Sequence, residues 1–98
     1  MVATVRFDRF ELDLVRRCLL DGGEPARLGA RAFDLLAALV ERRDRTVSKN
    51  DLLEIVWPGL VVEENNLQVQ ISTLRKLLGP QAIATVPGRG YRFTAAVA

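Results

Sequence analysis

The chain has 98 residues, of which 49% are hydrophobic and 27% are charged, and its formal net charge is +2. This composition predicts one compact domain and excludes a disordered tail or a low-complexity segment. One cysteine and no histidine exclude an internal disulfide and a cysteine-based metal cage, and they remove the commonest metal ligand and general base.

The sequence contains no candidate membrane segment. No apolar run approaches the roughly 20 residues that a spanning helix needs, and charges interrupt residues 1–10, which excludes a signal peptide there. Cys18 has no partner and indicates a reducing cytoplasm. In an apolar strand it is more typical of packing than of a redox sensor. We expect a cytoplasmic domain without metal or cofactor, either free or attached to a membrane anchor elsewhere in a longer protein.

Short alternating apolar runs predict an antiparallel meander of four strands between residues 4 and 28. The runs lie at about 5–7, 10–14, 18–20 and 26–28. Polar turns separate them, one at Arg16 and Arg17 and one at Asp21, Gly22 and Gly23. Glycine adopts a positive φ without steric cost, so the second turn fits a tight hairpin.

The apolar period then changes to that of a helix. Apolar residues recur at spacings of three and four between positions 33 and 40, which predicts an amphipathic helix over about 30–43. Ser48, followed three residues later by Asp51, is close to a capping box and predicts a second helix over about 49–56. The expected core face of this second helix consists of Leu52, Leu53, Ile55 and Val56.

A third helix, predicted over about 63–78, carries the most informative surface. Its expected core side consists of Leu67, Ile71, Leu74 and Leu78. The far side collects Asn65, Val69, Ser72, Thr73 and Lys76, with Asn66 and Gln70 on one flank and Gln68 and Arg75 on the other. An ordinary solvent face would carry Lys and Glu pairs. Amides and hydroxyls instead hydrogen-bond base edges, and a valine can pack on a thymine methyl.

Two β-prone runs predict a C-terminal hairpin over about 82–97, with Arg89 between two glycines at its tip. Such an arginine is well placed to contact a phosphate or a narrow minor groove. The tripeptide Gly88-Arg89-Gly90 is also typical of an ordinary solvent-exposed turn. After Glu64 the chain has no acidic residue. Either the C-terminal third presents a positive face or the acids are missing by chance. The basic residues there are Arg75, Lys76, Arg89 and Arg92.

Five segments resemble, in order and at family spacing, the OmpR/PhoB-type effector domain and its ToxR/CadC-like one-component relatives. They are residues 28–36, 47–53, 56–58, 69–76 and 85–93, which read LGARAFDLL, VSKNDLL, VWP, VQISTLRK and TVPGRGYRF. The resemblance covers nearly the whole chain. It implies an α+β winged helix-turn-helix: a four-stranded antiparallel sheet, three helices and a β-hairpin wing, all within one DNA-binding domain over 1–98.

The resemblance also implies roles for individual residues. The helix over 63–78 is expected in the major groove and the wing in the minor groove of promoter DNA. Base contacts are expected from Asn66, Val69, Gln70 and Thr73. Contacts to phosphates or through the wing are expected from Trp57, Asn65, Ser72, Arg75, Lys76, Thr85 and Arg89. Arg75 has an alternative role as a C-terminal cap that interacts with the helix dipole, and Trp57 is expected to be mainly a core residue.

Partners follow from the same resemblance. The turn over 57–62 is expected to contact RNA polymerase, although its apolar residues also fit packing under the third helix. Two copies are expected to pair on DNA, either head to tail or as a symmetric pair. The wing is closest to the one-component and ATPase-linked branch, whose winged domain often comes first in a longer chain. Additional domains outside this chain would fit that order, and the sequence leaves open whether it belongs to a longer protein.

The sequence departs from two-component members of the family at two places. Many of those members carry arginines where this chain has Ser72 and Thr73, and the wing has proline at position 87 and its arginine at 89. Both changes leave less positive charge, so we expect weaker nonspecific affinity and greater reliance on the wing or on paired protomers.

Two other functions were weighed. A near-neutral recognition helix also fits a winged-helix module that binds protein partners in a larger signalling protein. The lack of acidic residues after Glu64 disfavours that alternative. Enzymatic activity is not expected, because no histidine can activate Ser48, Ser72 or Cys18 as a nucleophile.

Overall fold

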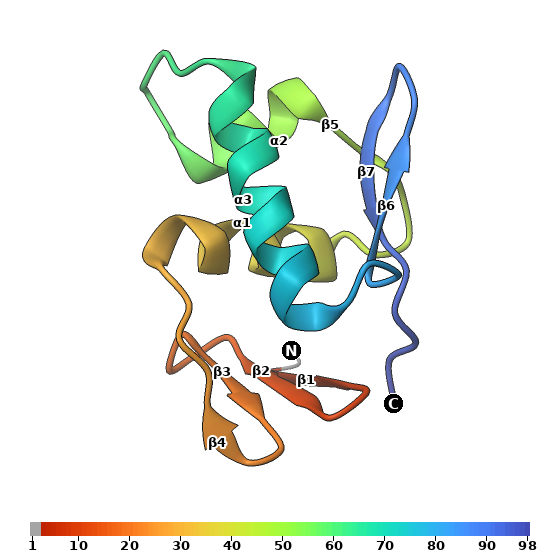
Figure 1. Cartoon of the computed structure of the whole chain (residues 1–98). Coiled ribbons are helices and arrows are strands. Elements are labelled where there is room, and N and C mark those ends of the chain that lie inside the picture. Colours follow the sequence, from red (N-terminus) through yellow and green to blue (C-terminus); the bar gives the residue numbers. More distant parts are fainter. Residues whose placement is uncertain (1–2) are drawn as a thin grey trace.

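The computed structural model describes residues 3–98, in which a four-stranded sheet, three helices and a three-stranded sheet follow one another (Figure 1). The first sheet has the order β1-β2-β3-β4, built from Thr4–Phe7, Phe10–Asp13, Cys18–Asp21 and Glu24–Pro25. The helices are α1 (Ala30–Glu41), α2 (Lys49–Val56) and α3 (Glu64–Leu78). The second sheet has the order β5-β7-β6, built from Val47–Ser48, Gly90–Phe93 and Ile83–Val86. This confirms the predicted α+β winged helix-turn-helix.

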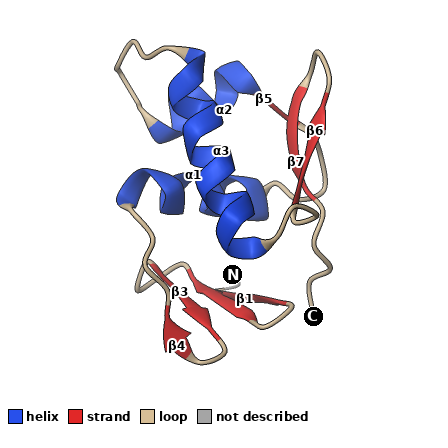
Figure 2. Ribbon diagram, in the orientation of Figure 1, coloured by secondary structure: helices blue, strands red, loops and turns tan. Residues whose placement is uncertain are grey.

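The first sheet lies across one end of the helical layer, as Figure 2 shows. Alternate side chains of its strands, including Val5, Phe7 and Leu12, are buried in a core that is continuous with the helices. On its edge, Arg9 hydrogen-bonds Asp21 at 2.5 Å, and this bond and the nearby negative charge raise the pKa of Arg9.

The fourth strand was predicted two residues too late. The hairpin turn at Gly22 and Gly23 pairs the residues directly beside it, with Asp21 opposite Glu24 and Leu20 opposite Pro25. Pro25 has no N–H to continue the ladder. The strand therefore consists of Glu24–Pro25 rather than 26–28, and only the Ala26 N–H still bonds back to the sheet.

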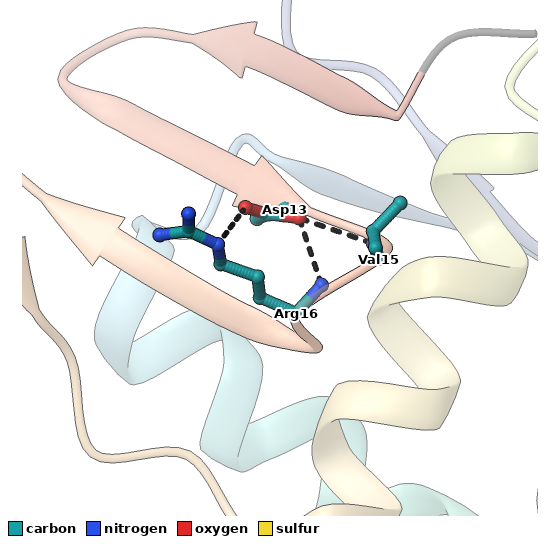
Figure 3. Close-up of polar contacts among 3 residues, drawn as sticks. All are labelled: Asp13, Val15 and Arg16. Atoms are coloured by element: carbon teal, nitrogen blue, oxygen red, sulfur yellow. Dashed lines mark hydrogen bonds and ion pairs between the residues drawn. The ribbon is translucent and has the colours of Figure 1, made fainter.

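The second strand ends one residue early because Asp13 organises the next turn. Its carboxylate accepts hydrogen bonds from the backbone N–H groups of Val15 and Arg16, at 3.1 and 2.9 Å (Figure 3). Arg17 then adopts a positive φ of 56°. This Asx-type turn leaves the side chain of Val15 exposed.

Helix α1 is the centre of the core, and it ends at Glu41 rather than at 43. All but four of its twelve residues are buried, because α2, α3 and β7 pack against it. The Arg42 and Arg43 side chains turn back and donate to the carbonyl oxygens of Ala38 and Val40. These side chains cap the last turn of α1 instead of extending the helix.

Helices α2 and α3 match their predicted bounds, with Glu63 as the N-cap of α3. The Ser48 hydroxyl accepts a hydrogen bond from the Asp51 N–H at 3.1 Å, which confirms the predicted cap. On α2 only Leu52 and Val56 are fully buried, while the other two predicted core residues are half-buried. The predicted core side of α3 is buried at all four positions. In residues 3–98 no helix is long and apolar enough to cross a membrane.

The hairpin ends at Phe93, so its predicted extension to 97 is wrong. Past Phe93 the chain leaves β6 and runs to the first sheet, where Val97 forms a bridge with Phe7 and the Ala98 N–H donates to the Arg6 carbonyl at 2.9 Å. The open edge of β1 offers these unpaired backbone groups. The Phe7 and Phe93 rings also meet edge to face at 5.0 Å, so the C-terminal segment joins both sheets.

Candidate nucleic-acid interface

Helix α3 and the hairpin β6–β7 form one side of the molecule. In Figure 1, α3 crosses the front of the helical layer and the hairpin stands beside it. α3 packs against both α1 and α2, with its four buried leucine and isoleucine residues turned inward. The opposite surface of α3 is therefore exposed next to the hairpin, which is the arrangement that a helix entering a groove requires.

The outward surface of α3 surrounds a shallow hollow of about 380 Å³. It is lined by Asn65, Gln68, Val69, Ser72, Thr73 and Lys76. Lys76 carries the only charge in this lining, at the C-terminal end of the helix. The Thr73 hydroxyl donates to the Val69 carbonyl at 3.1 Å. The hollow thus combines amides, hydroxyls and apolar groups, the types of side chain that contact base edges in the major groove.

The two flanking amides are less free than the sequence suggested. Asn66 is exposed, but its Nδ2 donates a hydrogen bond to the Glu63 carbonyl at 3.3 Å. This bond uses one of its amide donors at the start of α3. Gln70 is half-buried. The structure therefore brings Val69 and Thr73 together with Asn65 and Gln68 in the hollow, and it places Gln70 at the margin of that face.

Arg75 joins α3 to the hairpin, a contact that we call the Arg75 bridge. Its Nε and Nη2 donate to the Ile83 carbonyl at 3.2 and 2.9 Å, and Nη2 also donates to the Thr85 hydroxyl at 2.8 Å. The guanidinium carbon lies 5.9 Å from the centre of the Tyr91 ring. All of these contacts go to residues of the hairpin. The bridge fixes the hairpin relative to α3.

The tip of the wing presents Arg89 to solvent. Its N–H donates to the Val86 carbonyl at 3.0 Å and closes the turn, with a φ of 74° at Gly88. Gly90 is needed for a different reason, which is close packing: a Cβ there would lie 1.9 Å from the Val47 carbonyl oxygen. Only glycine lets β7 approach β5 this closely. The wing is therefore anchored to the start of α2 as well as to α3.

Sequence reasoning missed Lys49, at the first turn of α2. Its Nζ lies 3.1 Å from the Glu64 carboxylate, so the charge at the start of α3 is paired across the two helices. The signal available in the sequence was a lysine directly after the predicted cap at Ser48. The pair neutralises a carboxylate that would otherwise repel a phosphate backbone near α3.

Trp57 is buried, whereas part of the turn that follows it, over 58–62, is exposed. The Trp57 side chain is 8% exposed, which confirms the core interpretation, and the Arg31 guanidinium lies 6.0 Å from its ring centre. Val62 packs partly against the core. Leu60 and Val61 are exposed. Packing under α3 thus accounts for Val62 but not for the tip of the turn.

The architecture and the exposed face of α3 define a winged helix-turn-helix domain. Residues 23–93 match the family described as "Transcriptional regulatory protein, C terminal", and the chain belongs to this family. It is 37% identical over 100 residues to the cholera toxin transcriptional activator of Vibrio cholerae, an alignment that covers 92% of this chain and 34% of that protein. It is 37% identical over 87 residues to the phosphate regulon transcriptional regulatory protein PhoB of Pseudomonas aeruginosa, covering 85% and 38%.

Solved structures agree with these relatives. The DNA-binding domain of Escherichia coli CadC superposes with a TM-score of 0.83 at 27% identity, covering 99% of this chain and 96% of that one. The Klebsiella pneumoniae RstA DNA-binding domain, in complex with the RstA box, superposes with a TM-score of 0.78 at 30% identity, covering 95% and 98%. The chain spans between 34% and 42% of the length of the curated relatives that it matches.

Proposed function

We propose that this chain binds double-stranded promoter DNA in a sequence-specific manner, as the effector domain of a bacterial-type transcriptional regulator. Helix α3 would occupy the major groove and the β6–β7 wing the adjacent minor groove. The observation that carries the proposal is the exposed, mostly uncharged face of α3, which the Arg75 bridge holds beside the wing. The family match and the RstA complex with its box support it.

Within this proposal each side chain has a role set by its position. Val69 and Thr73, with Asn66 and the marginal Gln70, would contact bases. Contacts to phosphates or through the wing would come from Asn65, Ser72, Lys76, Thr85, Arg89 and the edge of Trp57. Arg75 would act mainly by positioning Thr85 and the wing. Its Nε and Nη2 atoms already donate three hydrogen bonds to Ile83 and Thr85.

The chain would act by binding, with further domains of a longer regulator supplying the signal. The exposed apolar tip formed by Leu60 and Val61 supports a contact with RNA polymerase, and the modest positive charge of α3 supports pairing of two copies on DNA. We also propose that this domain works in the cytoplasm, where promoter DNA is present.

The second candidate is a protein-interaction module on the same fold. The observation that favours it is the pair of exposed apolar side chains at Leu60 and Val61, since solvent-facing valine and leucine at one loop tip suit a protein partner. This surface is separate from the α3 hollow, whose lining residues do not include the loop. The two functions can therefore be tested with separate variants.

A selection from random DNA duplexes tests the proposal. The domain is expected to enrich a short motif, with an affinity that falls steeply with salt because phosphate contacts release counterions. The double variant Lys76→Ala, Arg89→Ala should bind more weakly and with a shallower salt dependence. Arg16→Ala, which removes another exposed positive charge, in the β2–β3 turn, is the control. Lack of enrichment and of salt-dependent binding would reject DNA binding and favour the protein-interaction module.

A further inference from the structure

The central turns of α3 lack the side chains that most often read guanine. Residues 65–73 include no charged residue. Of the flanking charges, Glu64 is paired with Lys49, and Arg75 is bound to Ile83 and Thr85. Lys76 is exposed at the C-terminal end of the hollow, one turn beyond these residues. Bidentate contacts from arginine or lysine to the O6 and N7 atoms of guanine are the commonest specific base contacts. Recognition by the middle of α3 must therefore use other base features.

Val69 and Thr73 present methyl groups one helical turn apart. The Val69 side chain is exposed to 52%, so it contributes little to the core. The Thr73 hydroxyl donates its hydrogen bond to the Val69 carbonyl. This bond draws the oxygen toward the backbone and leaves the γ-methyl group as the outward part of the side chain. The C5 methyl of thymine is the apolar group of the major groove, and it matches this pair.

Two amides border the methyl pair. Asn65 and Gln68 both line the hollow that contains Val69 and Thr73, and both are exposed. Asparagine and glutamine pair with the N6 and N7 atoms of adenine. The hollow therefore holds side chains suited to both members of an A·T pair, on adjacent positions of one helix face.

We propose, on the basis of the function proposed above, that the half-site is rich in A·T pairs and is recognised through thymine methyl groups. Val69 and Thr73 contact the methyls of neighbouring thymines, and Gln68 contacts an adenine, while Asn65 keeps the phosphate contact proposed above. Arg89 supports the same composition independently, because the narrow minor groove of A·T tracts concentrates negative potential that attracts arginine. Both reading elements of the domain favour the same kind of sequence.

Replacement of thymine by deoxyuridine in the selected motif tests this inference, because it removes only the methyl group. The unmodified domain should lose about fourfold in affinity at each of one or two positions, the value expected for one buried methyl-sized group. Val69→Ala should bind thymine and deoxyuridine equally at one of these positions. Val15→Ala, which truncates a valine that is exposed to 74% at the β2–β3 turn (Figure 3), should respond like the parent domain.

The outcomes separate this inference from the proposed function. A motif that is bound tightly but is insensitive to deoxyuridine at every position would overturn methyl recognition while leaving DNA binding intact. The same holds if Val69→Ala responds to deoxyuridine as the parent does, or if the enriched motif is rich in G·C pairs. Failure to bind any duplex would overturn both.

Discussion

Replacing Arg75 with alanine should weaken the fold and misplace the wing without removing a phosphate contact. The Arg75 bridge consists of three hydrogen bonds to Ile83 and Thr85 and a contact with the Tyr91 ring. One hydrogen bond from a charged group contributes about 1.5–3 kcal/mol. The three bonds share the Nη2 donor and the Ile83 carbonyl acceptor and the guanidinium is half-exposed, so we take about 1.5 kcal/mol for the whole set. The ring contact at 5.9 Å adds about 0.5 kcal/mol.

The free energy of unfolding should therefore fall by about 2 kcal/mol, which corresponds to a decrease in Tm of roughly 10 °C for a domain of this size. Urea unfolding measures the first quantity. The slope of log affinity against log salt measures the number of phosphate contacts, and it should stay unchanged for Arg75→Ala even though the affinity falls. Arg75→Lys should behave similarly, because an ammonium group cannot reproduce the forked contact with Ile83 and Thr85.

Lys76→Ala is the matched control, because it removes the same charge from the next, exposed position of α3. Its unfolding free energy should change by less than about 0.5 kcal/mol, while the salt slope should fall by about 0.9 if Lys76 contacts one phosphate. The reasoning is refuted if Arg75→Ala unfolds like the parent domain and its salt slope falls by a similar amount. Arg75 would then be a phosphate ligand rather than a bridge.

Three further changes test other parts of the structure. Gly90→Ala should destabilise the domain by more than about 2 kcal/mol, because the new Cβ would overlap the Val47 carbonyl; unchanged urea unfolding would contradict the packing of β5 on β7. Ser48→Ala should cost about 1 kcal/mol through the lost cap of α2, and an effect below 0.3 kcal/mol by the same assay would argue against that cap. Leu60→Ser with Val61→Ser should preserve stability and DNA affinity but lower transcription by the full-length regulator in a reporter assay; lost DNA affinity would place this turn in the DNA interface instead.

The helices and most of the recognition face could be predicted from the sequence, because these features depend on local periodicity. Spacings of three and four located α1, the capping signal at Ser48 located α2, and the pattern from Leu67 to Leu78 identified the buried side of α3. The cap at Ser48 was also local, since donor and acceptor lie three residues apart. The strands of the meander were found by alternation, with errors where turns changed the pairing.

Only the tertiary structure decided the features that depend on residues far apart in the chain. The role of Arg75 depends on Ile83 and Thr85, the need for glycine at position 90 depends on Val47, and the path after Phe93 depends on the open edge of β1. Periodicity reports which side of an element is apolar, but it does not report what that side meets. The amino-acid sequence by itself therefore determined the fold class and the face of α3. Tertiary packing determined which polar groups on and beside that face are already used within the protein and which remain free to bind a partner.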